Sequence, residues 1–295
     1  MPRAALVSIH ARVEGAGPYA WDDPSLVQVW GPRYQVYVVA ERDLAVFTLG
    51  RLPDAGRIRE RAVDLAERLH VLLDGAQMRY DDAGQALGIH GNNLRYAALT
   101  GRLAIRWEGA RRPLVWTVPP PDIAAAEATR ELARRYLHIL GPAAPEAFGK
   151  WAGVGGPKAV SVFDDLQDEL ISVLAPSGEA RLLARDEPAI RAAPAPAAPA
   201  RLLPSGDAYT LHGRSEDRAL LVPDAAQQRE LWTPRVWPGA VLVDGEIVGT
   251  WRRAQRKVTI RAWGRLSRAA REAVVAEAES LPLPGPGEGM AVEWI

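Results

Sequence analysis

The stretch that decides the fold runs from Tyr80 to Val118, YDDAGQALGIHGNNLRYAALTGRLAIRWEGARRPLVWTV. Asp residues near the start and a glycine at the end are typical of a short helix, here over Tyr80–Gly88. A second helix is predicted over Asn92–Thr100, before Gly101. Alternating apolar residues then predict two strands with a turn between them, at Arg102–Trp107, Glu108–Pro113 and Leu114–Val118. Helix, turn, helix and hairpin is the order of a winged helix.

The polar residues of this stretch stand where a winged helix meets DNA. The start of a recognition helix reaches base edges, and the tip of the wing contacts phosphates. We therefore expect DNA contacts from one helix start, the adjoining strand and the wing, at Asn92, Asn93, Arg95, Arg102, Arg111 and Arg112. Winged helices also serve as protein-interaction modules, so that alternative stays open.

A second pattern of this kind follows in residues 122–190. Ile123–Leu140 has apolar residues at helical spacing, and Gly141-Pro142 ends it. Two shorter helices and a hairpin are predicted next, at Pro145–Ala152, Pro157–Leu166, Glu169–Leu174 and Ala180–Ala184. This segment is the weaker of the two winged-helix predictions.

Residues 1–78 are expected to form an N-terminal winged-helix-like module. Leu26–Trp30 is interpreted as helical and Tyr34–Val39 as a strand. A short helix is predicted from Ala40 to Phe47, and a long one over Arg57–Leu73.

Alternating proline and alanine mark a linker at Arg191–Ala200, RAAPAPAAPA, where neither a helix nor a central strand can continue. Residues 201–295 then favour a β-rich domain with a hairpin at Asp244-Gly245. A closing helix over Ser267–Ser280 precedes a tail that starts at Pro282. The predicted strands are Ala208–His212, Ala219–Val222, Ala240–Val243, Ile247–Arg252 and Lys257–Ala262.

The fold class predicted from these elements is α+β. Tandem winged-helix modules at residues 1–78, 79–121 and 122–190 precede the linker at 191–200 and the β-rich domain at 201–295.

The formal net charge is zero, from 36 basic and 36 acidic residues, but the charges are unevenly placed. No acid occurs between Trp251 and Arg271, where the predicted hairpin carries cations that can lie on a phosphate backbone: Arg252, Arg253, Arg256 and Lys257. A solvated hairpin face, or the arginine usage of a GC-rich genome, explains the same charges without DNA.

The chain has no cysteine, and its five histidines, His10, His70, His90, His138 and His212, show no metal-ligand spacing. We therefore expect no metal and no cofactor. No apolar run is long enough for a membrane span, and the first ten residues lack a signal peptide. These observations predict a cytoplasmic protein without a membrane partner.

Several motifs together resemble one family. They are Trp30–Asp43 (WGPRYQVYVVAERD), with an arginine at Arg33, and then Tyr96–Arg102, Leu132–Tyr136, Phe148–Ala152, Leu202–Pro204 and Val243–Trp251. They are similar to motifs of the winged-helix DNA-binding proteins that include the AlkZ-like DNA glycosylases, over nearly the whole chain.

That resemblance implies tandem winged helices that bind double-stranded DNA as a monomer, with Arg33 among the DNA contacts. Active members of the family remove alkylated purines and unhook crosslinks without a metal, using a Gln-apolar-Gln or Gln-apolar-Asp tripeptide that positions the attacking water. The equivalent residues here are His10, Ala11 and Arg12.

His10 can bond to a water and accept its proton, whereas Arg12 has donors only and fits a contact to the lesion-bearing strand. Family members usually carry helical sequence before the tripeptide, so either the first module is incomplete or the start codon lies upstream.

The first hypothesis is therefore a DNA glycosylase-like repair protein that hydrolyses the N-glycosidic bond of alkylated purines or crosslinks. The second is a non-catalytic DNA-binding protein, a lesion sensor or transcriptional regulator. A structural or protein-interaction module is the third.

Overall fold

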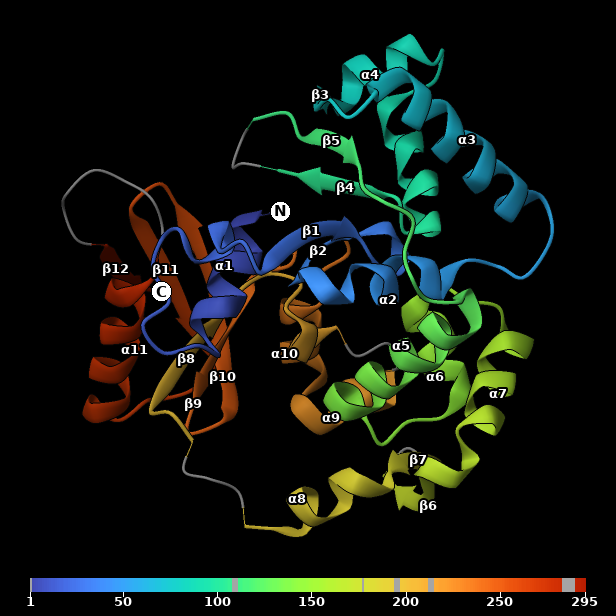
Figure 1. Cartoon of the computed structure of the whole chain (residues 1–295). Helices are drawn as coiled ribbons and strands as arrows, with labels where there is room; N and C mark the ends of the chain where they lie inside the picture. Colours follow the sequence, from blue (N-terminus) through green and yellow to red (C-terminus); the bar gives the residue numbers. More distant parts are fainter. Residues whose placement is uncertain (1, 108–110, 177, 194–196, 212–214, 283–289) are drawn as a thin grey trace. The chain divides into compact units, whose positions relative to one another are not determined.

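The computed structural model describes residues 2–107, 111–176, 178–193, 197–211, 215–282 and 290–295. They divide into two compact units, shown in Figure 1: residues 23–192 form one, and the residues up to Asp22 join residues 193–295 in the other. The sequence analysis placed the first 22 residues with residues 23–78 instead. The boundaries predicted between the winged-helix modules stay predictions.

The unit of residues 23–192 contains a five-stranded sheet in the order β2-β1-β4-β5-β3. β1 lies between β2 and β4 and is antiparallel to both, so the interpretation of Leu26–Trp30 as helical was wrong. Val27, Val29 and Trp30 are of residue types enriched in strands, and pairing on both edges settles this conformation. The strands are β1 (Leu26–Trp30), β2 (Val36–Ala40), β3 (Met78–Arg79), β4 (Leu103–Arg106) and β5 (Leu114–Thr117).

Helices surround this sheet and extend beyond it. The first three are α2 (Leu44–Thr48), α3 (Arg57–Leu73) and α4 (Tyr80–Ala86). The segment predicted as a recognition helix, Asn92–Thr100, forms a 3-10 helix over Gly91–Thr100, which is a correction to its type. Leu94, Ala97 and Ala98 of this helix are buried against α3 and the sheet. Of the predicted turn at 108–113, residues 108–110 lie outside the described residues.

The second half of this unit follows the predicted order closely. It contains α5 (Ala125–Leu140), α6 (Pro145–Ala152), α7 (Gly156–Asp165), the antiparallel hairpin of β6 (Leu170–Ala175) and β7 (Gly178–Leu183), and α8 (Glu187–Arg191). Phe148, fully buried, packs its ring against those of Tyr136, Trp151 and Phe163. This aromatic cluster is the core that joins α5, α6 and α7.

The other unit is a second five-stranded sheet, in the order β12-β11-β10-β9-β8. Figure 1 shows α11 lying along it. Its elements are α1 (Pro2–His10), β8 (Ala200–Leu203), α9 (Ser215–Leu221), α10 (Ala225–Leu231), β9 (Gly239–Val243), β10 (Glu246–Ala254), β11 (Lys257–Ala262), α11 (Arg268–Ser280) and β12 (Ala291–Trp294).

Two strands predicted for this unit were wrong. Residues 208–210 form a 3-10 helix because the Asp207 side chain caps its start, and the end of that predicted strand, His212, lies outside the described residues. Residues 219–221 belong to α9, where local helical hydrogen bonds replace strand pairing. β12 was missed because only four residues form it, after a Pro- and Gly-rich segment of which 283–289 lie outside the described residues.

A tryptophan fixes the centre of this sheet. The indole Nε1 of Trp251 donates to the carbonyl of Leu203, 2.8 Å away, which joins β10 to β8 across β9. A Cβ on Gly239 would lie 2.2 Å from that same nitrogen. Glycine is therefore the residue that lets β9 pass between the two strands.

Three short 3-10 helices lie in the unit of residues 23–192: Pro32–Tyr34, Glu41–Asp43 and Leu49–Arg51. The remaining 3-10 helices are Ala20–Asp22, Gln167–Glu169, Ala184–Asp186 and Ala208–Thr210. Among the described residues, no helix combines the length and the apolar character that crossing a membrane requires.

Because of ion pairs on α5, we predict that the stability of the unit of residues 23–192 depends on pH in the acidic range. Arg134 donates to Glu169 at 2.8 Å, and these hydrogen bonds hold the pKa of Glu169 below its ordinary value. The stabilisation is therefore fully present above the ordinary glutamate pKa and is lost as the pH falls through the lowered one. Because both partners are partly exposed, its size is below about 1 kcal/mol.

We expect Glu169→Gln to lower the free energy of unfolding at pH 7, and the difference from the native protein to shrink below about pH 4. Thermal and urea unfolding at a series of pH values measures this. Glu179→Gln, in the hairpin that follows Glu169, is the control. A deficit for Glu169→Gln that stays constant down to pH 3 would contradict the assignment.

Candidate active site and nucleic-acid interface

The tripeptide His10-Ala11-Arg12 is presented at the end of α1. Leu6 and Val7 of this helix are buried, and Val7 packs in the core of the sheet β8–β12. The helical turn continues past His10, since the amide of Ala11 donates to the carbonyl of Val7 at 3.0 Å. Because its apolar face is buried, the helix holds the tripeptide in a fixed orientation on this unit.

Arg12 is engaged by a buried carboxylate, that of Asp207. Its Nη2 lies 2.7 Å from Oδ1 and its Nη1 lies 2.9 Å from Oδ2. Ser8 donates its hydroxyl to Oδ2 at 2.5 Å, and the amide of Tyr209 donates to Oδ1 at 2.9 Å. The Asp207 side chain is 0% exposed, so these donors replace the water it loses on burial.

His10 lies beside a second buried acid. Its Nε2 is 3.2 Å from the hydroxyl of Ser280 and 4.0 Å from Oε2 of Glu277, both at the end of α11. Glu277 is held in place by the amide of Leu202 at 3.2 Å and by Arg201 at 3.3 Å. The imidazole of His10 therefore lies between a hydroxyl and a buried carboxylate.

The carbonyl of Ala11, between the two side chains, accepts from Nε of Arg201 at 3.2 Å. Both side chains and the backbone of the tripeptide are therefore bound to residues of the C-terminal stretch. His10 keeps a side-chain exposure of 16% and Arg12 one of 46%, so both are within reach of a ligand.

Sequence reasoning missed the acids that surround the tripeptide. Asp207 follows a Pro-Ser-Gly turn and looks like an ordinary helix cap. Glu277 had a readable signal: it shares the buried face of α11 with Val274 and Ala278. An acid on a buried helix face needs partners, but the sequence cannot say that one of them is His10.

In the unit of residues 23–192, Arg33 stands in a strained turn. Arg33 and Tyr34 both have positive φ values, 54° and 56°, which side chains with a Cβ rarely adopt. Arg33 is exposed and donates to the carbonyl of Lys150 at 3.3 Å. Strain of this kind is retained where the surroundings enforce it, and it is frequent at functional sites.

Buried Arg51 enforces this turn. It donates to the carbonyls of Ala152 at 2.8 Å and Trp30 at 3.2 Å, and its guanidinium lies 4.8 Å from the centre of the Tyr34 ring. Burial lowers the pKa of Arg51 to about 10, and burial likewise raises the pKa of Tyr34. Arg51 thus joins the backbone before the turn, at Trp30, to the end of α6, at Ala152, and lies beside the Tyr34 ring.

The residues predicted at the recognition helix differ in their surroundings. Asn92 is exposed and its amide is capped by the His90 ring at 3.2 Å. Asn93 and Arg95 are partly buried, and Arg95 lies over two tyrosine rings at 5.2 and 5.4 Å.

The cations of the predicted strand and wing have partners. Arg102 is paired with Glu67, and Arg112 with Asp81 at 3.1 Å. Arg111 is exposed and also takes part in an interaction. Acids therefore offset the charge that the sequence analysis assigned to DNA at Arg102 and Arg112.

The cations of the β10–β11 hairpin lie in the same unit as the tripeptide. Arg252 donates to the carbonyl of Val236 at 2.9 Å, and Lys257 is paired with Glu293 at 2.5 Å. Arg253 donates to the carbonyl of Gln255 at 2.5 Å, and Arg256 also takes part in an interaction. Arg252 and Lys257 are exposed at the turn.

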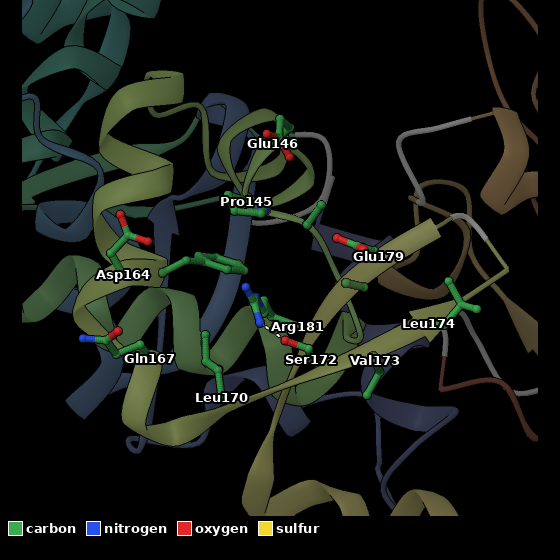
Figure 2. A pocket seen from close by; sticks show the side chains of 13 residues that line it. Pro145, Glu146, Asp164, Gln167, Leu170, Ser172, Val173, Leu174, Glu179 and Arg181 are labelled. Atoms are coloured by element: carbon green, nitrogen blue, oxygen red, sulfur yellow. Dashed lines mark hydrogen bonds between the residues drawn. The ribbon is translucent and has the colours of Figure 1, made fainter.

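A hollow of about 830 Å³ lies between α6, α7 and the β6–β7 hairpin, and Figure 2 shows the side chains that line it. Three carboxylates line it, those of Glu146, Asp164 and Glu179, while the guanidinium of Arg181 donates to Ser172. This charge is unfavourable for a phosphate. In the part of the chain that the structure describes, no group of three His, Asp or Glu side chains is arranged to hold a metal ion.

We expect Arg12→Ala to destabilise the unit formed by α1 and the C-terminal residues by roughly 1–3 kcal/mol, because the buried Asp207 loses two charged donors. Asp207→Asn in the same background should recover part of this loss, since a neutral amide is cheaper to leave buried. A double-mutant cycle by urea unfolding measures the coupling. Arg265→Ala is the exposed control, and additive effects of the two substitutions would contradict the pair.

Comparison with known proteins identifies the family of this chain. The sequence model of the family described as "DNA glycosylase AlkZ-like" matches residues 1–282. A curated relative, the "Interstrand DNA cross-link repair glycosylase" of Streptomyces sahachiroi, is 25% identical over 87% of this chain and 78% of its own length.

A solved structure, the Streptomyces sahachiroi DNA glycosylase AlkZ, shares the fold with a TM-score of 0.77 at 19% identity, over 99% of this chain and 89% of that chain. The family match covers nearly the whole sequence and confirms the assignment to the DNA glycosylase-like repair proteins. The chain therefore belongs to the DNA glycosylase AlkZ-like family.

Proposed function

We propose that this protein is a monofunctional DNA glycosylase that hydrolyses the N-glycosidic bond of alkylated purines or of purine crosslinks in double-stranded DNA. The observation that carries the proposal is the placement of His10, at the family's catalytic tripeptide, 3.2 Å from Ser280 and 4.0 Å from the buried carboxylate of Glu277. The curated relative, named as an interstrand cross-link repair glycosylase, supports the substrate class.

The proposed reaction needs only water. The water oxygen forms a bond to C1′ of the sugar as the bond from C1′ to the base nitrogen breaks, and the electron pair of that bond leaves with the base. His10 accepts the proton of the water, and Glu277 stabilises the resulting imidazolium. An N7-alkylpurine carries a positive charge and leaves as a neutral base, so the site needs no general acid.

Arg12 has a different role in this proposal. Its guanidinium binds Asp207 at 2.7 and 2.9 Å, so it fixes the orientation of the tripeptide, and its exposed edge is available to the phosphate of the lesion-bearing strand. Arg12 is thus first a positioning residue for His10.

The grip on duplex DNA is assigned to winged helices. The helix, 3-10 helix and hairpin of residues 80–117, and the two helices and hairpin of residues 145–183, have the required order of elements. We propose that phosphates and base edges are bound from the first of these, from the turn before β2 and from the β10–β11 hairpin, by Arg33, Asn92, Asn93, Arg95, Arg102, Arg111, Arg112, Arg252, Arg253, Arg256 and Lys257. We propose further that the protein binds DNA as a monomer and acts in the cytoplasm.

One observation favours a second candidate, a non-catalytic lesion sensor or regulator. Neither residue 10 nor residue 12 has an amide side chain, and the guanidinium of Arg12 is already bound by Asp207. Such a protein would bind alkylated DNA and leave the glycosidic bond intact.

Excision of N7-alkylguanine from a labelled duplex tests the proposal. We expect the native protein to give an abasic product, and His10→Ala to lower the single-turnover rate roughly 100-fold or more, because general base catalysis is lost. His10→Gln should retain more activity than His10→Ala, since glutamine is the family's residue at this position.

His138→Ala is the matched control, because His138 pairs with Asp186 in the other unit. Its excision rate should equal that of the native protein. A native protein that binds the alkylated duplex but releases no base would reject the glycosylase and leave the sensor. Equal rates for the native protein and His10→Ala would reject the role of His10.

A further inference from the structure

Arginine and tyrosine side chains alternate in one cluster of the unit of residues 23–192, which we call the Arg–Tyr ladder. The Arg51 guanidinium lies 4.8 Å from the centre of the Tyr34 ring, and that of Arg95 lies 5.2 Å from it. Arg95 also lies 5.4 Å from the centre of the Tyr96 ring, and Arg61 lies 4.3 Å from it. The two rings meet edge to face at 5.2 Å.

The ladder runs from the protein interior to the surface. Arg51 is 3% exposed and donates to two backbone carbonyls, so the inner end is fixed. Arg95 and Tyr96 belong to the 3-10 helix Gly91–Thr100 and are partly buried. Arg61, in the second turn of α3, is exposed. The outer end therefore presents two guanidinium groups that the rings hold in place.

In the part of the chain that the structure describes, no acid is paired with these three charges. Within the described ranges, neither Arg51, Arg61 nor Arg95 forms an ion pair, and the Nε of Arg95 is buried without a hydrogen-bond acceptor. Other cations near this 3-10 helix have acids: Arg68 pairs with Asp64 at 3.5 Å, and Arg102 with Glu67. The aromatic rings orient the guanidinium groups but leave their net charge in place.

The start of α3 adds to this charge. Arg57, Arg59 and Arg61 lie in its first turns against one acid, Glu60. Cations are disfavoured at the N-terminus of a helix, where the backbone amides already present partial positive charge. Three arginines there, with the unneutralised ladder beside them, indicate a surface whose complement is an anion.

If the Arg–Tyr ladder only stabilised the fold, Arg61 at its outer end would contribute little. Arg61 is exposed and free to extend into water, and ordering it on Tyr96 costs side-chain entropy. A ring that holds a guanidinium in place reduces the further entropy lost when it binds a phosphate. The arrangement is therefore that of a pre-oriented anion contact.

We propose that Arg61 and Arg95 bind backbone phosphates of duplex DNA, with Tyr34, Tyr96 and Arg51 as the positioning residues that orient them. The inference rests on the proposed DNA-binding function and adds to it a contact, Arg61, that nothing in the wing or in the sequence motifs assigns. Guanidinium groups suit this contact because they bind phosphate through two parallel hydrogen bonds.

Duplex affinity measured over a series of salt concentrations tests the inference, with a fluorescent unmodified 20-base-pair duplex as the probe. We expect Arg61→Ala to weaken binding at low salt roughly tenfold, as for loss of one charge-assisted hydrogen bond. The slope of log affinity against log salt should fall by about 1, because one fewer counterion is released. Arg68→Ala, the same charge change on the same helix but at a residue paired with Asp64, should leave both values unchanged.

Two variants of Tyr96 separate positioning from charge. Tyr96→Phe keeps the ring face and should bind as the native protein does. Tyr96→Leu keeps every charge but removes the face, so affinity should fall while the salt slope changes little. Thermal unfolding of each variant shows that the unit remains folded, and Arg61→Lys, which keeps the charge at an exposed position, provides a variant in which folding is not at issue. Its affinity should lie between those of the native protein and Arg61→Ala.

The outcomes are distinct. Native protein that fails to bind the duplex with a salt-dependent affinity overturns the DNA-binding function, and the inference with it. Salt-dependent binding that Arg61→Ala leaves unchanged in affinity and slope overturns the inference alone. Equal loss in Arg68→Ala and Arg61→Ala also overturns it, because general charge then explains the effect. In a further outcome, inorganic phosphate at millimolar concentration displaces the duplex although duplex affinity does not depend on Arg61. That result would overturn the Arg61 contact and identify a small-anion site instead.

Discussion

The carboxylate of Asp207 has no contact with water, and an ionised group in that position must find its hydrogen bonds inside the protein. It receives them from the hydroxyl of Ser8, the guanidinium of Arg12 and the amide of Tyr209. Two of these donors lie at the start of the chain, about 200 positions away in sequence. The position of α1, and with it that of His10, therefore follows from the hydrogen-bonding demand of one buried acid.

This constraint explains how a changed tripeptide can be accommodated. A neutral amide at position 12 would leave the Asp207 carboxylate short of positive charge, whereas arginine meets it with two parallel hydrogen bonds. Arg12 and Asp207 form a matched pair, and in the proposed mechanism the proton-accepting role then falls to His10 alone. The buried Glu277 beside His10 supplies a negative charge that an amide would not require.

The elements with strong local patterns were predicted well from the sequence. The limits of Arg57–Leu73 and Pro145–Ala152 are those of α3 and α6, because amphipathic spacing, proline and glycine determine them locally. The helix interpreted at Leu26–Trp30 was wrong, because these residues form a strand that pairs on both edges. The strands predicted at residues 208–210 and 219–221 were also wrong. There, a side-chain cap and local helical hydrogen bonds outweigh a composition that is typical of strands.

The same distinction holds for the candidate site. His10 and Arg12 could be identified from the family's tripeptide. Asp207, Glu277 and Ser280 could not, because their importance lies in distances between residues that are far apart in the chain. Charge in the sequence also does not reveal pairing: Arg102 and Arg112 have acids beside them, whereas Arg61 of α3 forms no ion pair with any of the described residues.

The placement of α1 has a consequence for how the protein is made. A ribosome synthesises α1 before residues 23–192, but the strand β8 and the helix α11, which share a core with Val7, come from the last third of the chain. Residues 23–192 form a compact unit of their own and are complete well before that point. The first helix must therefore wait, with its apolar face in water, while a whole unit emerges and folds behind it. The tripeptide His10-Ala11-Arg12 is thus translated before the unit of residues 23–192, yet it reaches its final position only after β8 and α11 have been made.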